Sequence, residues 1–173
     1  MSWWSAPLGG TVFTSTGPID ILPAAELGLA EDSAGEERAE VWAMGIDHGA
    51  RVREILGPAD WARLAAEFPR DVTASRRYDW DRWTGQRGPW ILPDWLAAAR
   101  EWDGIHLSIG GYLTAARLPL GAGNAMTLLA GWEPDQTLWL NDRFTTADRV
   151  GSWRGTPGSD ALPEVTLPWL EYR

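Results

Sequence analysis

The residues best suited to proton transfer are His106 and Tyr112, because the chain carries only two histidines among 173 residues. Ile105, Leu107 and Ile109 alternate with polar residues, which is the period-two pattern of a strand with one buried face. The pattern predicts that His106 lies on the polar face of a central strand, where it could act as a general acid or base together with Tyr112. The competing interpretation is that His106 has a purely structural role, with its hydrogen bonds made inside the protein.

Two glycines follow this predicted strand and allow two interpretations. Gly110 and Gly111 could let a ligand approach the backbone closely, or they could mark a β-bulge. A bulge would decide whether Tyr112 shares a face with His106. We expect the strand to resume at Tyr112 and to run to Ala115.

A second set of candidate residues lies in a segment rich in arginine and tryptophan. From Arg70 to Trp90, five arginines stand against three aspartates, a local charge of +2 in a chain whose formal charge is −9. Guanidinium groups bind phosphates and carboxylates through paired donors, and indole rings stack on bases and sugars. We therefore expect an irregular loop that holds an anionic, ring-bearing ligand through Arg76, Arg77, Asp79, Trp80, Arg82, Trp83 and Trp90. The alternative is an internal Arg–Asp–Trp network that stiffens the loop.

The sequence contains few of the residues and motifs that covalent catalysis or metal binding requires. The chain has neither cysteine nor lysine, which excludes thiol nucleophiles, disulfides and Schiff bases. No nucleophile elbow, phosphate-binding glycine loop, dinucleotide fingerprint or zinc spacing occurs. Asp47, His48, Asp103 and His106 could supply metal ligands, but no spacing motif joins them. We expect neither a metal nor a cofactor.

Composition and charge narrow the class of protein. Hydrophobic residues make up 45% of the chain, which is typical of a globular protein, and the length favours one domain. Thirteen tryptophans exceed what packing alone requires, so several should lie at the surface or in a cleft. The acidic charge disfavours a nucleic-acid duplex and an anionic membrane as partners. It would suit a basic protein, although many proteins are simply acidic.

The location of the protein is predicted from two absences. The first residues lack the basic start and the apolar core of a signal peptide. No window approaches the roughly 18 apolar residues of a membrane-spanning helix. We therefore expect a cytoplasmic protein.

Hydrophobic periodicity and turn residues predict the elements that must position these side chains. Helices are expected at residues 23–30, 36–44, 58–68 and 93–102, the last with Pro93 and Asp94 in its first turn and ended by Gly104. Strands are expected at residues 51–56 and 105–109, with a turn at 121–124 and a hairpin of 125–132 with 136–140 around Pro134 and Asp135. Residues 1–18 should form an irregular arm or a short edge strand. The tail should wrap the surface, with Trp169 and Leu170 docking at its end.

This order of elements predicts an α+β fold in a single domain that covers residues 1–173. Its mixed or antiparallel sheet should carry two or more helices on one face. Residues 1–50 would form an irregular and helical arm, and residues 146–173 the surface-wrapping tail. The alternative is a small β-barrel with flanking helices.

Three segments of the chain, 73–79, 102–114 and 132–140, carry a family resemblance. They resemble an uncharacterised family of tryptophan-rich hypothetical proteins from bacteria with GC-rich genomes. The resemblance covers roughly residues 51–142. It implies that this region behaves as one unit, and it brings no known activity with it.

Two functions of different classes fit these observations. The first is a small enzyme or ligand-binding domain that acts by acid–base chemistry on an aromatic or nucleotide-like anionic molecule. It requires the arginine-rich loop and His106 to enclose one pocket. The second is an acidic protein-binding module, immunity-like or antitoxin-like, for a basic protein partner, since tryptophan and arginine dominate interface hot spots. Whether the protein is an enzyme stays open at this point.

Overall fold

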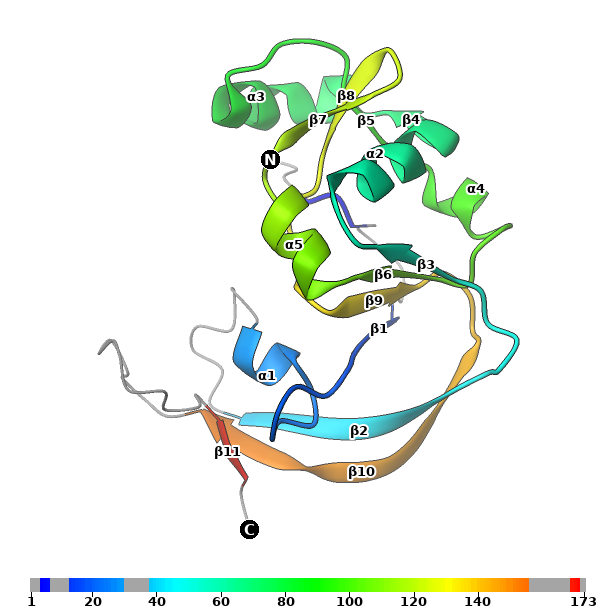
Figure 1. The fold of residues 1–173 in the computed structure, drawn as a ribbon, viewed down its shortest axis with the longest axis vertical. Coiled ribbons are helices and arrows are strands. Elements are labelled where there is room, and N and C mark those ends of the chain that lie inside the picture. Colours follow the sequence, from blue (N-terminus) through cyan, green and yellow to red (C-terminus); the bar gives the residue numbers. More distant parts are fainter. Residues whose placement is uncertain (1–3, 7–12, 30–37, 156–168, 172–173) are drawn as a thin grey trace.

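The computed structural model describes residues 4–6, 13–29, 38–155 and 169–171, and in these ranges the chain forms an α+β fold of helices and mixed or antiparallel sheets (Figure 1). The predicted fold class is therefore confirmed. None of the sheets in these ranges closes into a barrel, so the barrel alternative is wrong. Within the same ranges, no helix combines the length and the apolar character needed to cross a membrane.

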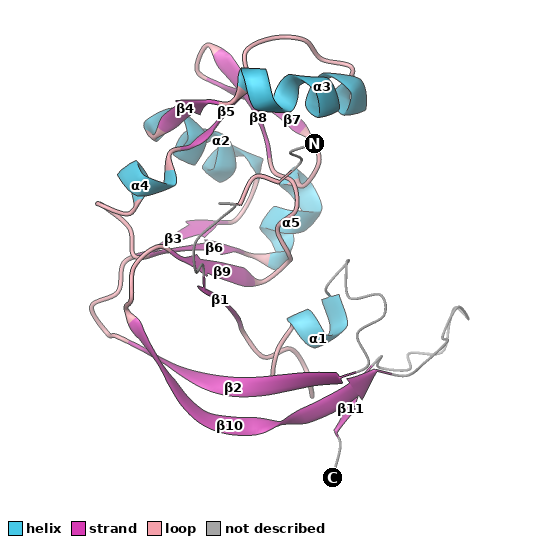
Figure 2. Ribbon diagram, turned by 180° about the vertical axis from the view of Figure 1, so that it is seen from behind, coloured by secondary structure: helices cyan, strands magenta, loops and turns pink. Residues whose placement is uncertain are grey.

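A four-stranded mixed sheet forms the middle layer of the molecule. Its order is β1, β9, β6 and β3, with bounds Phe13–Thr16, Gln136–Trp139, Gly104–Leu107 and Val52–Ile55. β3 and β6 run parallel, whereas the other two pairings are antiparallel. Helices α2 (Pro58–Glu67) and α5 (Ile109–Ala115) cover one face of this sheet (Figures 1 and 2). The predicted helices on one face are thus present.

The opposite side of the molecule is a long antiparallel ribbon. It consists of β2, β10 and β11, with bounds Arg38–Ile46, Phe144–Gly155 and Trp169–Glu171. Helix α1 (Glu26–Leu29) packs on it through a small apolar cluster that includes Leu27 and Trp153. The predicted helix at 36–44 is wrong from Arg38 onward, because pairing with β10 makes this part a strand, whereas residues 36 and 37 lie outside the described ranges. β10 likewise extends through the first part of the predicted surface-wrapping tail.

Shorter elements build the layer above the central sheet. They are the antiparallel pair of β4 with β5 (Pro69–Asp71, Ile91–Pro93), the hairpin of β7 with β8 (Pro119–Ala122, Ala125–Leu128), and the helices α3 (Thr73–Thr84) and α4 (Trp95–Ala98). The predicted turn at 121–124 is confirmed, with Gly123 at φ 62°. The predicted hairpin of 125–132 with 136–140 is wrong. β8 pairs with β7, while β9 crosses to the central sheet and pairs with β6 and β1.

The arginine-rich segment is mostly helical and not an irregular loop. Helix α3 ends at Gly85, which adopts φ 69° and donates its N–H to the carbonyl of Asp81. Such a left-handed glycine is a common helix end. Within the helix only Trp80 is buried. A helix with one buried position shows no apolar stripe, which explains why periodicity did not reveal it.

The sequence predicted part of the structure around α4 and β6 correctly. Asp94 caps α4 instead of lying in its first turn, and its carboxylate accepts hydrogen bonds from the N–H groups of Leu96 and Ala97, whereas Pro93 belongs to β5. The helix is shorter than predicted, and Gly104 opens β6 instead of ending the helix in a left-handed conformation. The predicted strand at 112–115 is wrong. Ser108 caps α5 by accepting the N–H of Gly111 at 2.9 Å, which starts a helix directly after β6.

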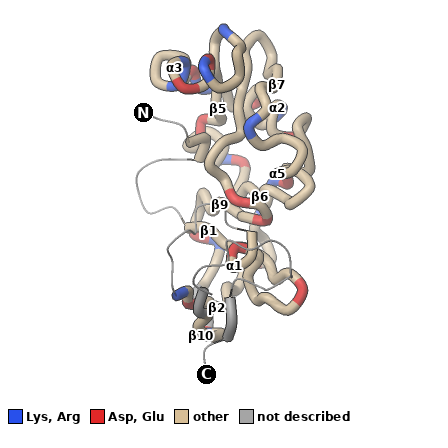
Figure 3. The backbone as a smooth tube through the Cα atoms, turned by 90° about the vertical axis from the view of Figure 1, so that its left-hand side faces the viewer, with Lys and Arg blue, Asp and Glu red and all other residues tan. Residues whose placement is uncertain are grey.

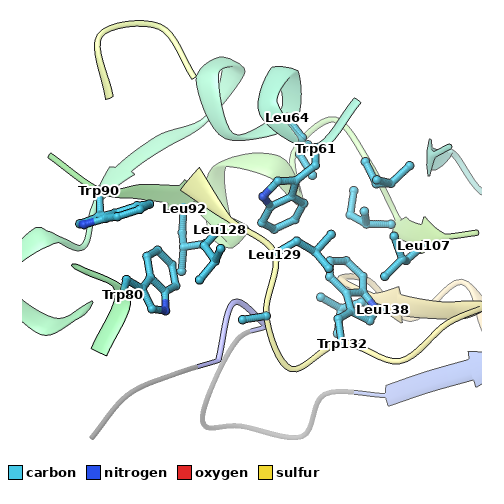
Figure 4. Packing of buried hydrophobic residues seen from close by; sticks show 13 residues of the cluster. Trp61, Leu64, Trp80, Trp90, Leu92, Leu107, Leu128, Leu129, Trp132 and Leu138 are labelled. Carbon is cyan, nitrogen blue, oxygen red and sulfur yellow. The ribbon is translucent and has the colours of Figure 1, made fainter. Parts of the chain in front are cut away.

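Tryptophan packing forms the core between the sheet and the upper layer. Trp61 contacts Trp132 edge-on at a centroid distance of 5.9 Å, and Trp80 contacts Trp90 in the same way at 5.3 Å (Figure 4). All four side chains are buried. Edge-to-face aromatic pairs of this kind add about 0.5–1.5 kcal/mol beyond the burial of their area. Several of the thirteen tryptophans are therefore structural.

Candidate functional site: an acidic cleft at His106

His106 lies in the middle of the central sheet. Its β6 neighbours Ile105 and Leu107 are buried, while His106 is half-buried on the other face. The predicted strand and the predicted polar face are both confirmed. Glu54 of β3 and Thr137 of β9 occupy the adjoining positions in register on either side. The sheet therefore fixes which side chains surround the imidazole.

Both ring nitrogens of His106 face carboxylates. Nδ1 lies 2.6 Å from Oε2 of Glu54, a hydrogen-bond distance, and Nε2 lies 3.5 Å from Oδ1 of Asp135, an ion-pair distance. When the imidazole is protonated, both nitrogens donate toward negative oxygens. The side chain thus bridges two carboxylates that come from different parts of the chain.

Asp135 is held in place by contacts with Thr16, the last residue of β1, and with Gly17, which follows β1. Its Oδ2 accepts the N–H of Gly17 at 2.8 Å and the hydroxyl of Thr16 at 3.3 Å. Its backbone adopts φ 58°, a left-handed conformation that is uncommon outside glycine and that aspartate tolerates better than most residues. The predicted turn at Pro134 and Asp135 is present. The interpretation of Asp135 as a turn residue alone missed its position beside His106.

These residues stand in the wall of a cleft of about 1180 Å³. The cleft lies between the central sheet and the β2–β10 ribbon, with β1 and α1 at its sides (Figures 1 and 2). Aromatic side chains contribute part of the lining, among them Phe13, Trp42 and Trp139. Trp139 is fixed because its Nε1–H donates to Oγ of Ser15 at 2.9 Å. The cleft therefore has an apolar part and a polar part.

The charges that line the cleft are mostly negative. Five carboxylate residues and one arginine border it: Glu26, Glu40, Glu54, Glu133, Asp135 and Arg38. Figure 3 shows acidic positions in red around β6, β1 and α1. Arg149 reaches Glu40 from β10 at 3.4 Å and offsets part of this charge. The lining favours a cationic ligand over the anionic one that the sequence suggested.

Two of the three predicted ligand-binding tryptophans are buried in the core. Trp80 and Trp90 are fully buried and pack on each other, and Nε1–H of Trp90 donates to Oδ1 of Asp81 at 2.7 Å. Rings in this position cannot stack on a ligand. They belong to the internal network that was the alternative interpretation of this segment.

The remaining residues of that predicted site lie on α3, which occupies the opposite end of the molecule from the β2–β10 ribbon (Figure 1). Arg76 donates to the backbone carbonyl of Trp4 at 3.0 Å, and burial lowers the pKa of its guanidinium. Asp79 is half-buried, whereas Arg77, Arg82 and Trp83 are exposed. None of the seven predicted ligand-binding residues lines the cleft at His106. The arginine-rich segment and His106 therefore do not line one common cleft among the described residues.

Tyr112 is also separated from the cleft. It lies on α5, where it packs against the apolar core, and it is not part of the cleft wall. The two glycines before it lie in the first turn of this helix, so they do not form a β-bulge. A Cβ on Gly111 would lie 2.1 Å from the carbonyl oxygen of Ile55, whereas a Cβ on Gly110 would meet nothing closer than 3.9 Å. Gly111 is required for helix packing.

Asp47 and Asp103, the two acidic residues among the candidate metal ligands, are paired with other residues of the chain. Asp103 accepts the N–H of Arg51 at 2.9 Å and the amide of Asn141 at 3.1 Å, and these bonds together with nearby arginines lower the pKa of its carboxyl. Asp47 pairs with Arg143 at 3.0 Å. Over the part of the chain that the structure describes, no cluster of histidine and acidic side chains could hold a metal ion.

Comparison with known proteins adds no assignment, since no family model, no curated protein and no solved structure matches this chain. The site must therefore be judged on its geometry. Sequence reasoning found His106 but missed Glu54 and Asp135. Glu54 stood on a predicted strand as a polar residue, but only the parallel pairing of β3 with β6 shows that it meets His106.

Proposed function

We propose that this protein is a binding module that takes a cationic segment of a partner protein into the acidic cleft at His106. One observation carries the proposal. Glu54 and Asp135 stand on the two sides of His106, in a cleft whose other charged residues are three carboxylates and one arginine. The first function considered, an enzyme for an anionic molecule, would need cationic groups at this place.

The size of the cleft favours a protein segment over a small molecule. Pockets for small molecules have volumes of about 300–1,000 Å³ and enclose most of the ligand. This cleft of about 1180 Å³ is bordered along one side by almost the whole of β2. Trp42, which borders it, is 54% exposed. Exposed tryptophans at a binding surface are typical hot-spot residues.

The charge of the whole chain supports the same partner. A net charge of −9 attracts a basic protein over distances of about 10 Å at ordinary salt concentrations. Close pairing with Glu54 and Asp135 would then fix the orientation of the bound segment. Guanidinium is the best suited group, because its fork of donors matches carboxylates in pairs.

The experiment that tests this function is a comparison of two labelled peptides by fluorescence anisotropy. One alternates arginine with valine and the other alternates glutamate with valine, both about eight residues long. We expect the basic peptide to bind, with an affinity that falls steeply between about 0.05 and 0.5 M salt, and the acidic peptide to remain unbound. Equal binding of both peptides, or binding that ignores salt, would exclude the proposed function.

One observation favours a second candidate, acid–base chemistry on a small molecule. The 2.6 Å hydrogen bond that Glu54 Oε2 accepts from His106 Nδ1 fixes the orientation of the imidazole, as a carboxylate does for a catalytic imidazole. The acidic lining would then select a neutral or cationic substrate. In this case small guanidinium or ammonium compounds should raise the melting temperature. His106→Ala should abolish turnover of such a compound without abolishing its binding.

A further inference from the structure

In the part of the chain that the structure describes, β2 pairs with a neighbouring strand on one side only, and its other edge borders the cleft. The neighbour is β10, so β2 is an end strand of its sheet over these residues. Every residue of β2 except Gly45 lines the cleft. Successive side chains of a strand point to opposite faces, so a wall made of consecutive residues is formed by the edge of the strand. The backbone N–H and C=O groups of this edge are therefore within reach of a ligand in the cleft.

A second strand edge borders the same cleft. β1 pairs with β9 on one side and is an end strand of the central sheet over the described residues. All four residues of Phe13–Thr16 line the cleft, again as consecutive positions. The cleft thus runs between the edges of two strands. An extended polypeptide is the ligand shape that fits such a space, because it can pair with an edge along its length.

The β2 edge is apolar and carries few of the features that normally prevent pairing. Its stretch from Val41 to Ile46 contains no charged residue and no proline, and Trp42 and Ile46 are 54% and 43% exposed. Natural proteins protect exposed edges with lysine, proline or inward charges. A long apolar edge without them is typical of a strand that pairs with another chain.

Charge complementarity identifies the kind of chain. Glu54 of β3 and Asp135 of the turn before β9 line the same cleft as the β2 edge. The side chains of a strand beside β2 would point to the two faces of the sheet, and long, flexible cationic side chains such as arginine could bend from there toward these carboxylates. A second copy of this chain carries the same excess of acidic residues and would be repelled. A basic extended segment could form backbone hydrogen bonds with the β2 edge and ion pairs with the carboxylates.

We infer that an extended, basic segment of a partner protein adds to the edge of β2 as a further strand, with cationic side chains directed at Glu54 and Asp135. This inference rests on the proposed function and deepens it by naming the mode of recognition. Backbone hydrogen bonds to β2 would supply affinity for an extended chain, and the carboxylates would select basic side chains.

Hydrogen exchange at residues 38–46 tests the inference. The probe is the alternating arginine–valine peptide, and its control is an alternating arginine–proline peptide of the same length and charge, in which every second residue lacks an N–H donor. In the free protein, the amides on the open edge of β2 should exchange rapidly. The arginine–valine peptide should slow these amides by about tenfold or more, and the arginine–proline peptide should bind at least about tenfold more weakly.

Each other outcome overturns the inference. Binding of both peptides with equal affinity, without slower exchange in β2, would reject strand addition and leave the proposed function standing. Failure of the arginine–valine peptide to bind at all would reject both. Edge amides of β2 that are already protected in the free monomer, or that become protected only as the protein dimerises, would show that this chain itself covers the edge.

Discussion

Glu54 Oε2 lies 2.6 Å from His106 Nδ1 because the two residues are in register on neighbouring parallel strands. The pairing of β3 with β6 fixes their backbones, so the contact does not depend on a mobile loop. Asp135 approaches the other nitrogen from the turn before β9. Three separate segments of the chain therefore build one acidic centre, and the fold of the central sheet is what creates it.

Gly111→Ala should destabilise the protein, whereas Gly110→Ala should not. A Cβ at Gly111 would clash with the carbonyl oxygen of Ile55 at 2.1 Å, which would push α5 away from β3. Crowding of this kind costs about 1–3 kcal/mol. Alanine at Gly110 has room and favours the helix. Urea unfolding of both variants measures the difference. Equal stabilities would contradict the packing of α5 against the end of β3.

Trp90→Ala should cost about 3–5 kcal/mol of unfolding free energy, because a fully buried indole and its contact with Trp80 are lost. Trp83→Ala, on the exposed side of α3, is the matched control and should cost less than about 1 kcal/mol. Thermal and urea unfolding report both values. A small cost for Trp90→Ala would restore the possibility that this indole serves a ligand.

Asp103→Asn should remove a contribution to stability that depends on pH. The pKa of Asp103 is lowered in the folded state below its usual 3.8, chiefly by the hydrogen bond from the N–H of Arg51. The folded state therefore binds this proton less readily than the unfolded state does. The contribution is complete above the unfolded pKa and is lost as pH falls through the folded pKa.

The difference in unfolding free energy between the native protein and Asp103→Asn should be about 1–2 kcal/mol at pH 7 and should shrink below about pH 4. Asp142→Asn, an exposed carboxylate, is the control and should show no such change. Urea titrations over this pH range give the answer. A difference that stays constant into strong acid would exclude the ionised carboxyl of Asp103 as its source.

Local signals predicted the elements that depend on their own residues. Helix α2 forms within the predicted range 58–68 and buries Trp61, Leu64 and Ala65, and Asp94 stands at the start of α4, where its carboxylate caps the helix. The β6 alternation placed His106 on the correct face. In each case the period or the cap was complete within a few neighbouring residues, so no distant partner was needed.

Elements that depend on distant partners were not predicted. The stretch from Arg38 to Met44 is a strand because it pairs with β10, which lies about a hundred residues later. β9 does not pair with β8, because it pairs with β1 and β6 instead. Helix α3 buries little apart from Trp80 and so lacks a periodic signal. The candidate site has the same origin, since Glu54 and Asp135 join His106 only through tertiary pairing.

The most direct test of the proposed function is the affinity of the alternating arginine–valine peptide for the native protein and for the double variant Glu54→Gln/Asp135→Asn. Both substitutions remove a negative charge and keep the size of the side chain. The matched control is Glu101→Gln/Asp142→Asn, which removes the same charge from exposed positions outside the cleft. We expect Kd to rise at least about tenfold for the first variant and less than about threefold for the control. An unchanged Kd for Glu54→Gln/Asp135→Asn, or an equal rise in both variants, would contradict the assignment of the His106 cleft as the binding site.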